Sequence, residues 1–191
     1  MNFTVESRYP LSIFNDNNVA IDWDTIKVGW DLQRITPDEI SKFAVDYLEQ
    51  HPSLVNEYVS ELIFGVKDYE IGTYLQNVFK SLGMGTPEKN SIRWNIQWRK
   101  WRYCIMSEMV KNISNSADLL QAIEGVYADF GYPEDMNGFI YYIPIDQRIT
   151  ENTIDTLDGH EKLMKVLNTF LVDEKRKIDQ NDGVLPFRGI D

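Results

Sequence analysis

Apolar residues recur along most of the chain at the three- and four-residue spacing of helices that bury one face. Thr36 predicts the start of one such helix, because it can cap the first turn while Pro37 takes the first helical position and Glu39 completes a capping box. Two more amphipathic stretches follow, and each ends at a glycine suited to a left-handed C-terminal cap, Gly65 and Gly83. Helices joined by such short connections are expected to pack as antiparallel neighbours.

The longest predicted helix covers roughly residues 87–113 and is apolar on two sides. The two sides are formed by Trp94, Trp98, Trp101, Ile105 and Met109, and by Ile96, Tyr103, Met106 and Val110. A helix with two apolar faces is normally buried between other helices. We therefore expect this Trp-rich helix to be the central element of the fold.

The chain after the Trp-rich helix predicts two more helices. Ser116 is the expected N-cap of the first, which ends at Gly131. Residues 139–145 are rich in aromatic and β-branched residues, and their pattern fits either a short strand or an extended buried segment. The last helix is expected over roughly 154–176, with a loosely ordered tail from about 179.

The N-terminal part predicts an extended arm over residues 3–14 and a first helix around 23–30. With 191 residues, of which 43% are hydrophobic and 13% aromatic, the chain has enough apolar material for a packed interior. The pattern as a whole predicts a mainly α fold, a single domain over 1–191 built as a bundle of about six or seven helices.

Acidic residues outnumber basic ones by 30 to 19, which gives a net charge of −11. This charge disfavours nucleic acid and anionic membrane surfaces as partners. The longest uncharged apolar run, 139–145, is too short to cross a bilayer, and residues 1–10 lack the apolar core of an export signal. With one cysteine and therefore no internal disulfide, these features predict a cytoplasmic protein.

The charge is distributed unevenly along the chain. Residues 87–115 hold six basic and two acidic residues, whereas residues 116–161 hold ten acidic residues and one basic residue. Bases alternate with tryptophans over 94–102, as they do in single-stranded nucleic-acid platforms. Because the tryptophans share one helical face and the bases lie around the others, we interpret the tryptophans as core and the bases as ion-pair partners of acidic helices.

Few residues are candidates for catalysis. His51 is expected to cap the end of a helix, His160 lies in a polar stretch, and Cys104 lies mid-helix, where cysteine is usually a small buried residue. The chain has neither the spacing of a calcium loop nor that of a zinc helix, so no metal or cofactor is expected. Carboxylates from different helices can still converge, which leaves a carboxylate-based hydrolase, with or without a metal, as an alternative.

Three phrases of the sequence are familiar together: residues 26–30 leading into 35–37, residues 126–135, and residues 141–144. They resemble the small bacterial family called domain of unknown function 2247, and the likeness covers most of the chain. The resemblance implies a protein of the kind encoded beside contact-dependent or secreted polymorphic toxins, where small acidic neighbours act as immunity proteins. It implies no catalytic residues.

We therefore expect a non-enzymatic binding protein, an immunity protein that neutralises a cognate basic toxin through an acidic surface within 118–161. Four acids that flank predicted turns are the candidate contacts, namely Glu134, Asp135, Asp155 and Asp158. The same acids could instead pair inside the fold with the bases Arg93, Arg99, Lys100 and Arg102. A helical scaffold that binds peptides in a groove lined by exposed aromatic residues is a further alternative.

Overall fold

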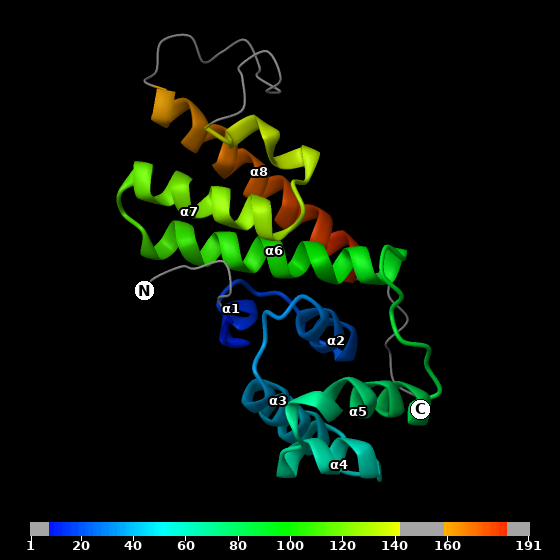
Figure 1. Cartoon of the computed structure of the whole chain (residues 1–191). Helices are drawn as coiled ribbons and strands as arrows, with labels where there is room; N and C mark the ends of the chain where they lie inside the picture. The colour runs from blue at the N-terminus through cyan, green and yellow to red at the C-terminus, as the bar shows by residue number, and fades with distance from the viewer. Residues whose placement is uncertain (1–7, 142–158, 183–191) are drawn as a thin grey trace. The chain divides into compact units, whose positions relative to one another are not determined.

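The computed structural model describes residues 8–141 and 159–182 (Figure 1). All regular structure in these ranges is helical, which confirms the mainly α prediction. The chain divides into two compact units, one ending at Trp101 and the other beginning at Arg102. Helix α6 (Ile92–Asn112) therefore supplies its first half to one unit and its second half to the other. The single domain over 1–191 stays a prediction.

The unit that ends at Trp101 contains five helices before α6. They are α1 (Ser12–Asn15), α2 (Trp23–Asp31), α3 (Pro37–Gln50), α4 (Glu57–Phe64) and α5 (Asp68–Ser81). Helix α4 packs against both α3 and α5, and α5 also contacts α2. The three amphipathic stretches predicted from Thr36 to Gly83 are α3, α4 and α5, and each packs against the next, as predicted. The extended arm was wrong over 12–14, which belong to α1, and residues 3–7 lie outside the described ranges.

Helix α3 begins as predicted at Thr36, whose side chain accepts the Glu39 N–H at 3.3 Å. The other half of the predicted capping box was wrong, because the Glu39 carboxylate accepts the backbone N–H of Leu11 at 2.8 Å instead. Leu11 directly precedes α1, so its N–H has no acceptor within that helix. Although burial alone would raise the pKa of Glu39, hydrogen bonds from Lys42 and Leu11 hold it below the ordinary value of 4.5.

Two glycines end their helices as predicted. Gly65 follows α4 with φ of +82°, and Gly83 follows α5 with φ of +70°. Both values lie in the left-handed region, where a side chain would be strained.

The unit that begins at Arg102 contains the second half of α6, followed by α7 (Ser116–Asp129), the 3-10 helix η1 (Glu134–Phe139) and α8 (Gly159–Asp182). Helix α8 packs against both α7 and η1. The N-cap of α7 is Asn115, whose side chain accepts two backbone N–H groups, so the prediction of Ser116 was wrong by one residue. Asparagine caps as well as serine, and local pattern does not separate adjacent candidates.

Two predicted boundaries differ from the structure. Phe139 ends η1 and is not in a strand, Ile140 has an extended backbone, and residues 142–158 lie outside the described ranges. Residues 179–182, expected in a loose tail, are the last turn of α8. The buried side chain of Ile178 and an ion pair between Lys175 and Asp179 support this turn. With 24 residues, α8 is also longer than α6, which has 21 and begins at Ile92.

The Trp-rich helix α6 is a core element, as predicted. Trp94, Trp101, Ile105 and Met109 are buried on one side, and Met106 is fully buried on the other. Trp98 and Val110, which were expected on these apolar faces, are only half-buried. None of the helices in the described ranges combines the length and the apolarity that spanning a membrane requires.

Candidate functional site

Polar side chains of α6 meet the first turn of α2 in the unit that ends at Trp101. Asp22 caps α2 by accepting the Thr25 N–H at 2.7 Å, and the Thr25 hydroxyl lies 2.8 Å from Oε1 of Gln97. The Trp101 indole N–H donates to the Thr25 carbonyl at 2.9 Å. One residue, Thr25, therefore joins the start of α2 to two positions on α6, and this arrangement holds the helices together.

Asp24 is a buried carboxylate beside this contact. It is 2% exposed, and burial raises its pKa above the ordinary value of 3.8, although Arg93 opposes the shift. Buried acids with raised pKa values are common at active sites. Here Arg93 donates to both carboxylate oxygens, from Nε at 2.9 Å and Nη2 at 2.5 Å. Asp24 is therefore held in an ion pair. The sequence offered Arg93 as a partner for the acids of 118–161, whereas its partner in the structure is Asp24 on α2.

A second ion pair network lies in the unit that begins at Arg102. The Arg102 guanidinium, which is fully buried, donates two hydrogen bonds of 2.7 Å to the two oxygens of Asp135 and one of 3.1 Å to Glu174. The side chain of Glu174 is 1% exposed, whereas that of Asp135 is 48% exposed. The Phe170 ring lies 5.1 Å from the guanidinium carbon. The network therefore joins η1 and α8 to α6.

This network shows that one of the four predicted contact residues is paired inside the fold. Asp135 is paired with Arg102, which is the internal pairing that the sequence left open as an alternative. Glu134 is exposed in the first turn of η1. Asp155 and Asp158 lie outside the described residues. Among the described candidates, Glu134 is thus the one whose side chain faces solvent without a place in the Arg102 network.

The histidines and the cysteine have the local positions that the sequence predicted. His51 follows α3, and its Nδ1 lies 2.8 Å from the Tyr47 carbonyl, as a capping residue does. His160 is in the first turn of α8, with its ring 5.7 Å from that of Tyr141. Cys104 is buried in α6. Within 8–141 and 159–182, no three His, Cys, Asp or Glu side chains converge as metal ligands would.

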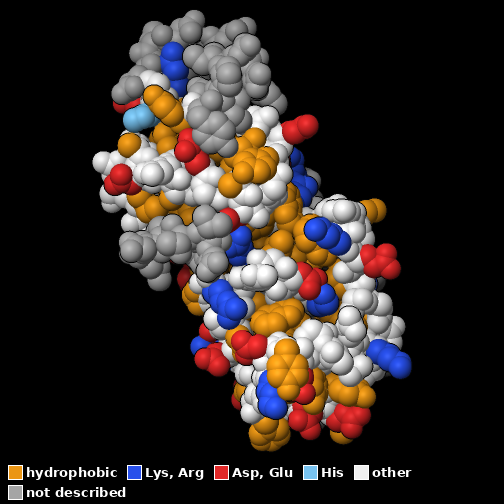
Figure 2. Space-filling view, in the orientation of Figure 1, with side chains coloured by type: hydrophobic (Ala, Val, Ile, Leu, Met, Phe, Trp, Pro, Cys, Tyr) orange, Lys and Arg blue, Asp and Glu red, His pale blue; other side chains and the backbone are white. Residues whose placement is uncertain are grey.

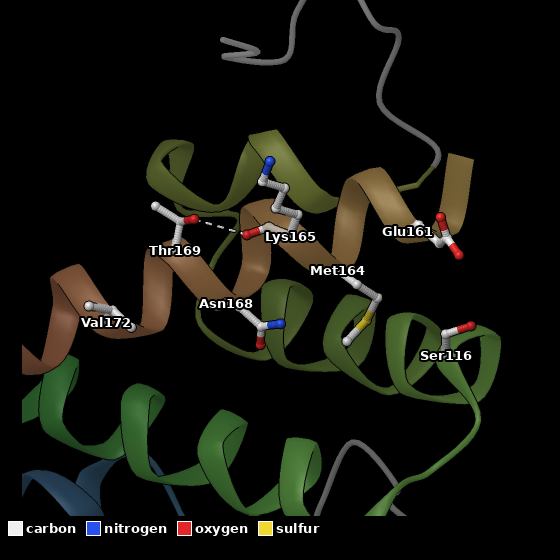
Figure 3. Close-up of a pocket in the computed structure, with 7 residues that line it drawn as sticks. All are labelled: Ser116, Glu161, Met164, Lys165, Asn168, Thr169 and Val172. Atoms are coloured by element: carbon white, nitrogen blue, oxygen red, sulfur yellow. Dashed lines mark hydrogen bonds between the residues drawn. The ribbon is translucent and has the colours of Figure 1, made fainter. Parts of the chain in front are cut away.

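A shallow groove of about 590 Å³ runs along α8 beside the start of α7 (Figure 3). Figure 3 shows Met164 directed toward α7, with Glu161 and Ser116 at one end of the groove. Val172, at the other end, is 71% exposed. The described lining contains no aromatic residue, so this groove lacks the feature expected of the peptide-binding scaffold.

A second hollow of about 540 Å³ lies between the end of α2 and the start of α5. Its lining combines two aromatic rings with two carboxylates, and consists of Arg8, Trp30, Asp31, Gln33, Ile35, Asp68 and Tyr69. Apolar and acidic side chains also lie close together on the surface of α3, α4 and α5 in Figure 2. Phe64, the last residue of α4, is 86% exposed. Sequence reasoning missed this hollow, because 35 or more residues separate Trp30 and Asp31 from Asp68 and Tyr69.

Comparison with known proteins identifies the family. A family model described as "Uncharacterized protein conserved in bacteria (DUF2247)" matches residues 11–175. No curated protein and no solved structure matches the chain. The matched range begins just before α1 and extends through most of α8, so it includes most of each unit and all residues of both ion pair networks. The chain therefore belongs to the DUF2247 family of bacterial proteins.

Proposed function

We propose that this chain is a non-enzymatic cytoplasmic immunity protein that binds and neutralises a basic bacterial toxin through an acidic surface. The observation that carries the proposal is the composition of residues 116–141, which hold five acids and no basic residue. Asp118 on α7 and Glu134 on η1 are exposed. Such a surface attracts a cationic protein and orients it before contact.

Three of the basic residues of α6 support the proposal, because they are buried or paired inside the fold. Lys100 is 1% exposed and Arg102 is fully buried, while Arg93 is bound to Asp24. Half of the six basic residues in 87–115 are therefore used inside the fold, whereas Lys89 and Lys111 are exposed. Asp118 and Glu134, exposed on α7 and η1, have no basic residue within 116–141 to neutralise them, and this supports their use in binding a partner.

The two most buried carboxylates also favour binding over hydrolysis. Asp24 and Glu174 each bind an arginine inside the fold. A catalytic carboxyl group must exchange a proton with a substrate, or attack it, at an accessible position. Asp24 and Glu174 are instead held inside the fold by their arginine partners.

The proposal predicts that a toxin is encoded beside the gene for this chain, and it is tested with the toxin domain of that neighbour. The domain is expressed in bacteria with and without the chain, and growth is measured. We expect growth to be restored only when the chain is present. Purified toxin domain and chain should then associate rapidly at low salt, with a rate constant that falls as the salt concentration rises.

A double variant tests the surface itself. Asp118→Lys with Glu134→Lys should slow association by about tenfold at low salt and flatten its salt dependence. The matched control is Asp46→Lys with Glu49→Lys, which makes the same charge change at exposed positions of α3. Equal association rates for the two double variants would show that the α7–η1 surface is not the binding site. A toxin that kills cells regardless of the chain would refute the immunity role.

A further inference from the structure

Tyr132 follows the end of α7 and has a backbone conformation that tyrosine rarely adopts. Gly131 and Tyr132 both have positive φ, of +78° and +60°. Glycine takes this left-handed region freely, whereas a bulky side chain is strained there. Among the described residues, Asn18, Gln33 and Asn90 also have positive φ, and Tyr132 is the only aromatic residue of these four. A tyrosine at this position therefore costs stability that a glycine or an asparagine would not.

Backbone hydrogen bonds at the end of α7 hold Tyr132 in this conformation. The Tyr132 N–H donates to the Tyr127 carbonyl at 2.8 Å, and the Gly131 N–H donates to the Ala128 carbonyl at 3.1 Å. These are the two bonds of a Schellman motif, which ends a helix at a glycine. The helix end therefore sets the backbone at Tyr132, whichever side chain the residue carries.

The Tyr132 ring is held by a neighbouring ring and yet remains largely exposed. It packs edge-on against the Tyr127 ring, with 5.2 Å between the ring centres. The Tyr127 hydroxyl donates to Oδ1 of Asn137 on η1 at 2.9 Å, so the supporting ring is itself fixed. Tyr132 is nevertheless 61% exposed. A tyrosine with few rotatable bonds that is already held in place loses little conformational entropy when a partner binds it.

The contact with Tyr127 is a weak reason for a tyrosine at residue 132. An apolar contact between these two positions commonly accompanies a Schellman motif, but here it covers the smaller part of the residue. Residues in strained backbone conformations cluster at binding and active sites. Tyrosine is also one of the residue types enriched among binding hot spots. A strained, held and exposed tyrosine is therefore typical of a residue that binds a partner.

The charges around Tyr132 favour a basic partner. Glu134, two residues later in the first turn of η1, is exposed. Residues 116–141 contain no basic residue, and Arg102, which binds Asp135 from α6, is fully buried. Helix α8, which packs against η1, holds five acidic and five basic residues and so adds no net charge. An aromatic residue bordered by charged ones also matches the apolar core and polar rim of protein interfaces.

We propose that Tyr132 is the apolar anchor with which the α7–η1 surface, marked by Asp118 and Glu134, holds its basic protein partner. The Tyr132 ring occupies an apolar recess of the partner, and Glu134 contacts basic side chains at the edge of that recess. The inference rests on the proposed function for the identity of the partner and adds a division of roles. The exposed acids set how fast the partner associates, and Tyr132 sets how slowly it dissociates.

The test measures association and dissociation rate constants for the full chain and the purified toxin domain encoded beside its gene. Tyr132→Asn removes the ring and introduces a residue that accepts the left-handed backbone. We expect the dissociation rate constant to rise at least about tenfold, whereas the association rate constant and its salt dependence change less than about twofold. The matched control is Tyr69→Asn, which removes a 76% exposed tyrosine from the unit that ends at Trp101 and should leave both rate constants unchanged.

Urea denaturation of the same variant separates binding from folding. Tyr132→Asn should retain the urea midpoint of the wild type, because relief of the strained backbone offsets the lost contact with Tyr127. A clear fall of the midpoint together with wild-type dissociation would show that the tyrosine serves the fold, and it would overturn the proposal.

The proposal is also overturned if Tyr132→Asn dissociates from the toxin domain no faster than Tyr69→Asn, or if it changes association alone. This failure is distinct from failure of the immunity role. A chain that restores growth and binds the toxin domain, with unchanged dissociation in Tyr132→Asn, retains the role and rejects the anchor. A wild-type chain that binds no toxin domain overturns both.

Discussion

Replacing Glu174 with glutamine should destabilise the protein far more than replacing Asp135 with asparagine, although both carboxylates bind the Arg102 guanidinium. The side chain of Glu174 is 1% exposed and Arg102 is fully buried, so Glu174→Gln leaves a buried positive charge with one counter-ion fewer. Breaking a buried ion pair from one side costs about 3–5 kcal/mol. We expect about 3 kcal/mol, because Asp135 remains.

Asp135→Asn should cost only about 1 kcal/mol, because a half-exposed carboxylate is stabilised by water when it is unpaired and screened by water when it is paired. The same reasoning explains why reversing Asp135 to lysine is a poor test of partner binding. A lysine there would place a second positive charge against buried Arg102, and a loss of binding would then report a loss of folding.

Urea denaturation at pH 7 measures both costs, with and without 1 M sodium chloride. Salt should reduce the effect of Asp135→Asn and leave that of Glu174→Gln nearly unchanged, since ions screen exposed pairs more than buried ones. The double variant Arg102→Met with Glu174→Met removes both buried charges, and it should recover most of the stability lost in Glu174→Gln. Equal destabilisation by the two single variants would refute the assignment of Glu174 as the buried partner.

Three further predictions concern the fold. Gly29→Ala should lower the free energy of unfolding by about 1–3 kcal/mol, because the new Cβ would lie 2.3 Å from the Trp101 ring. Gly125→Ala, with open space around it, should raise the free energy of unfolding by up to about 1 kcal/mol, and urea titrations measure both changes. Trp101→Ala should cost about 3–5 kcal/mol and Trp98→Ala clearly less, since Trp98 is only half-buried; equal melting temperatures would contradict the burial. Because the pKa of Glu39 is lowered on folding, its contribution to stability is complete above its unfolded pKa and is lost as pH falls through its folded pKa, so Glu39→Gln should flatten the decline of the melting temperature below about pH 5.

Local pattern in the sequence predicted the helices well, because each signal acts within a few residues. Thr36 caps α3 through an N–H three residues away, and Gly65 ends α4 by its own backbone conformation. The prediction of the capping box failed because a group that is distant in the sequence binds a side chain expected to make a local hydrogen bond. Glu39 looked like half of a capping box, but the Leu11 N–H, 28 residues earlier, takes its carboxylate.

The candidate site could be predicted only in part for the same reason. Asp135 was recognised as an acid beside a turn, yet its partner Arg102 lies 33 residues away and Glu174 lies 72 residues from Arg102. No periodicity links such positions. The composition of the acidic stretch is a property of neighbouring residues and so was visible, whereas the pairing of individual charges depends on how the helices meet.

The bond between the Trp101 indole and the Thr25 carbonyl has a consequence for the order in which the protein is made. Thr25 is synthesised 76 residues before Trp101. The Trp101 ring also packs edge-on against the Phe14 ring, with 4.7 Å between the ring centres. At synthesis rates of about 5–20 residues per second, the first two helices wait about 4–15 s for the side chain that covers them. During that interval the part of their surface that Trp101 covers, at Phe14 and Thr25, is exposed on the nascent chain. We therefore expect α1 and α2 to be the segment that a chaperone protects.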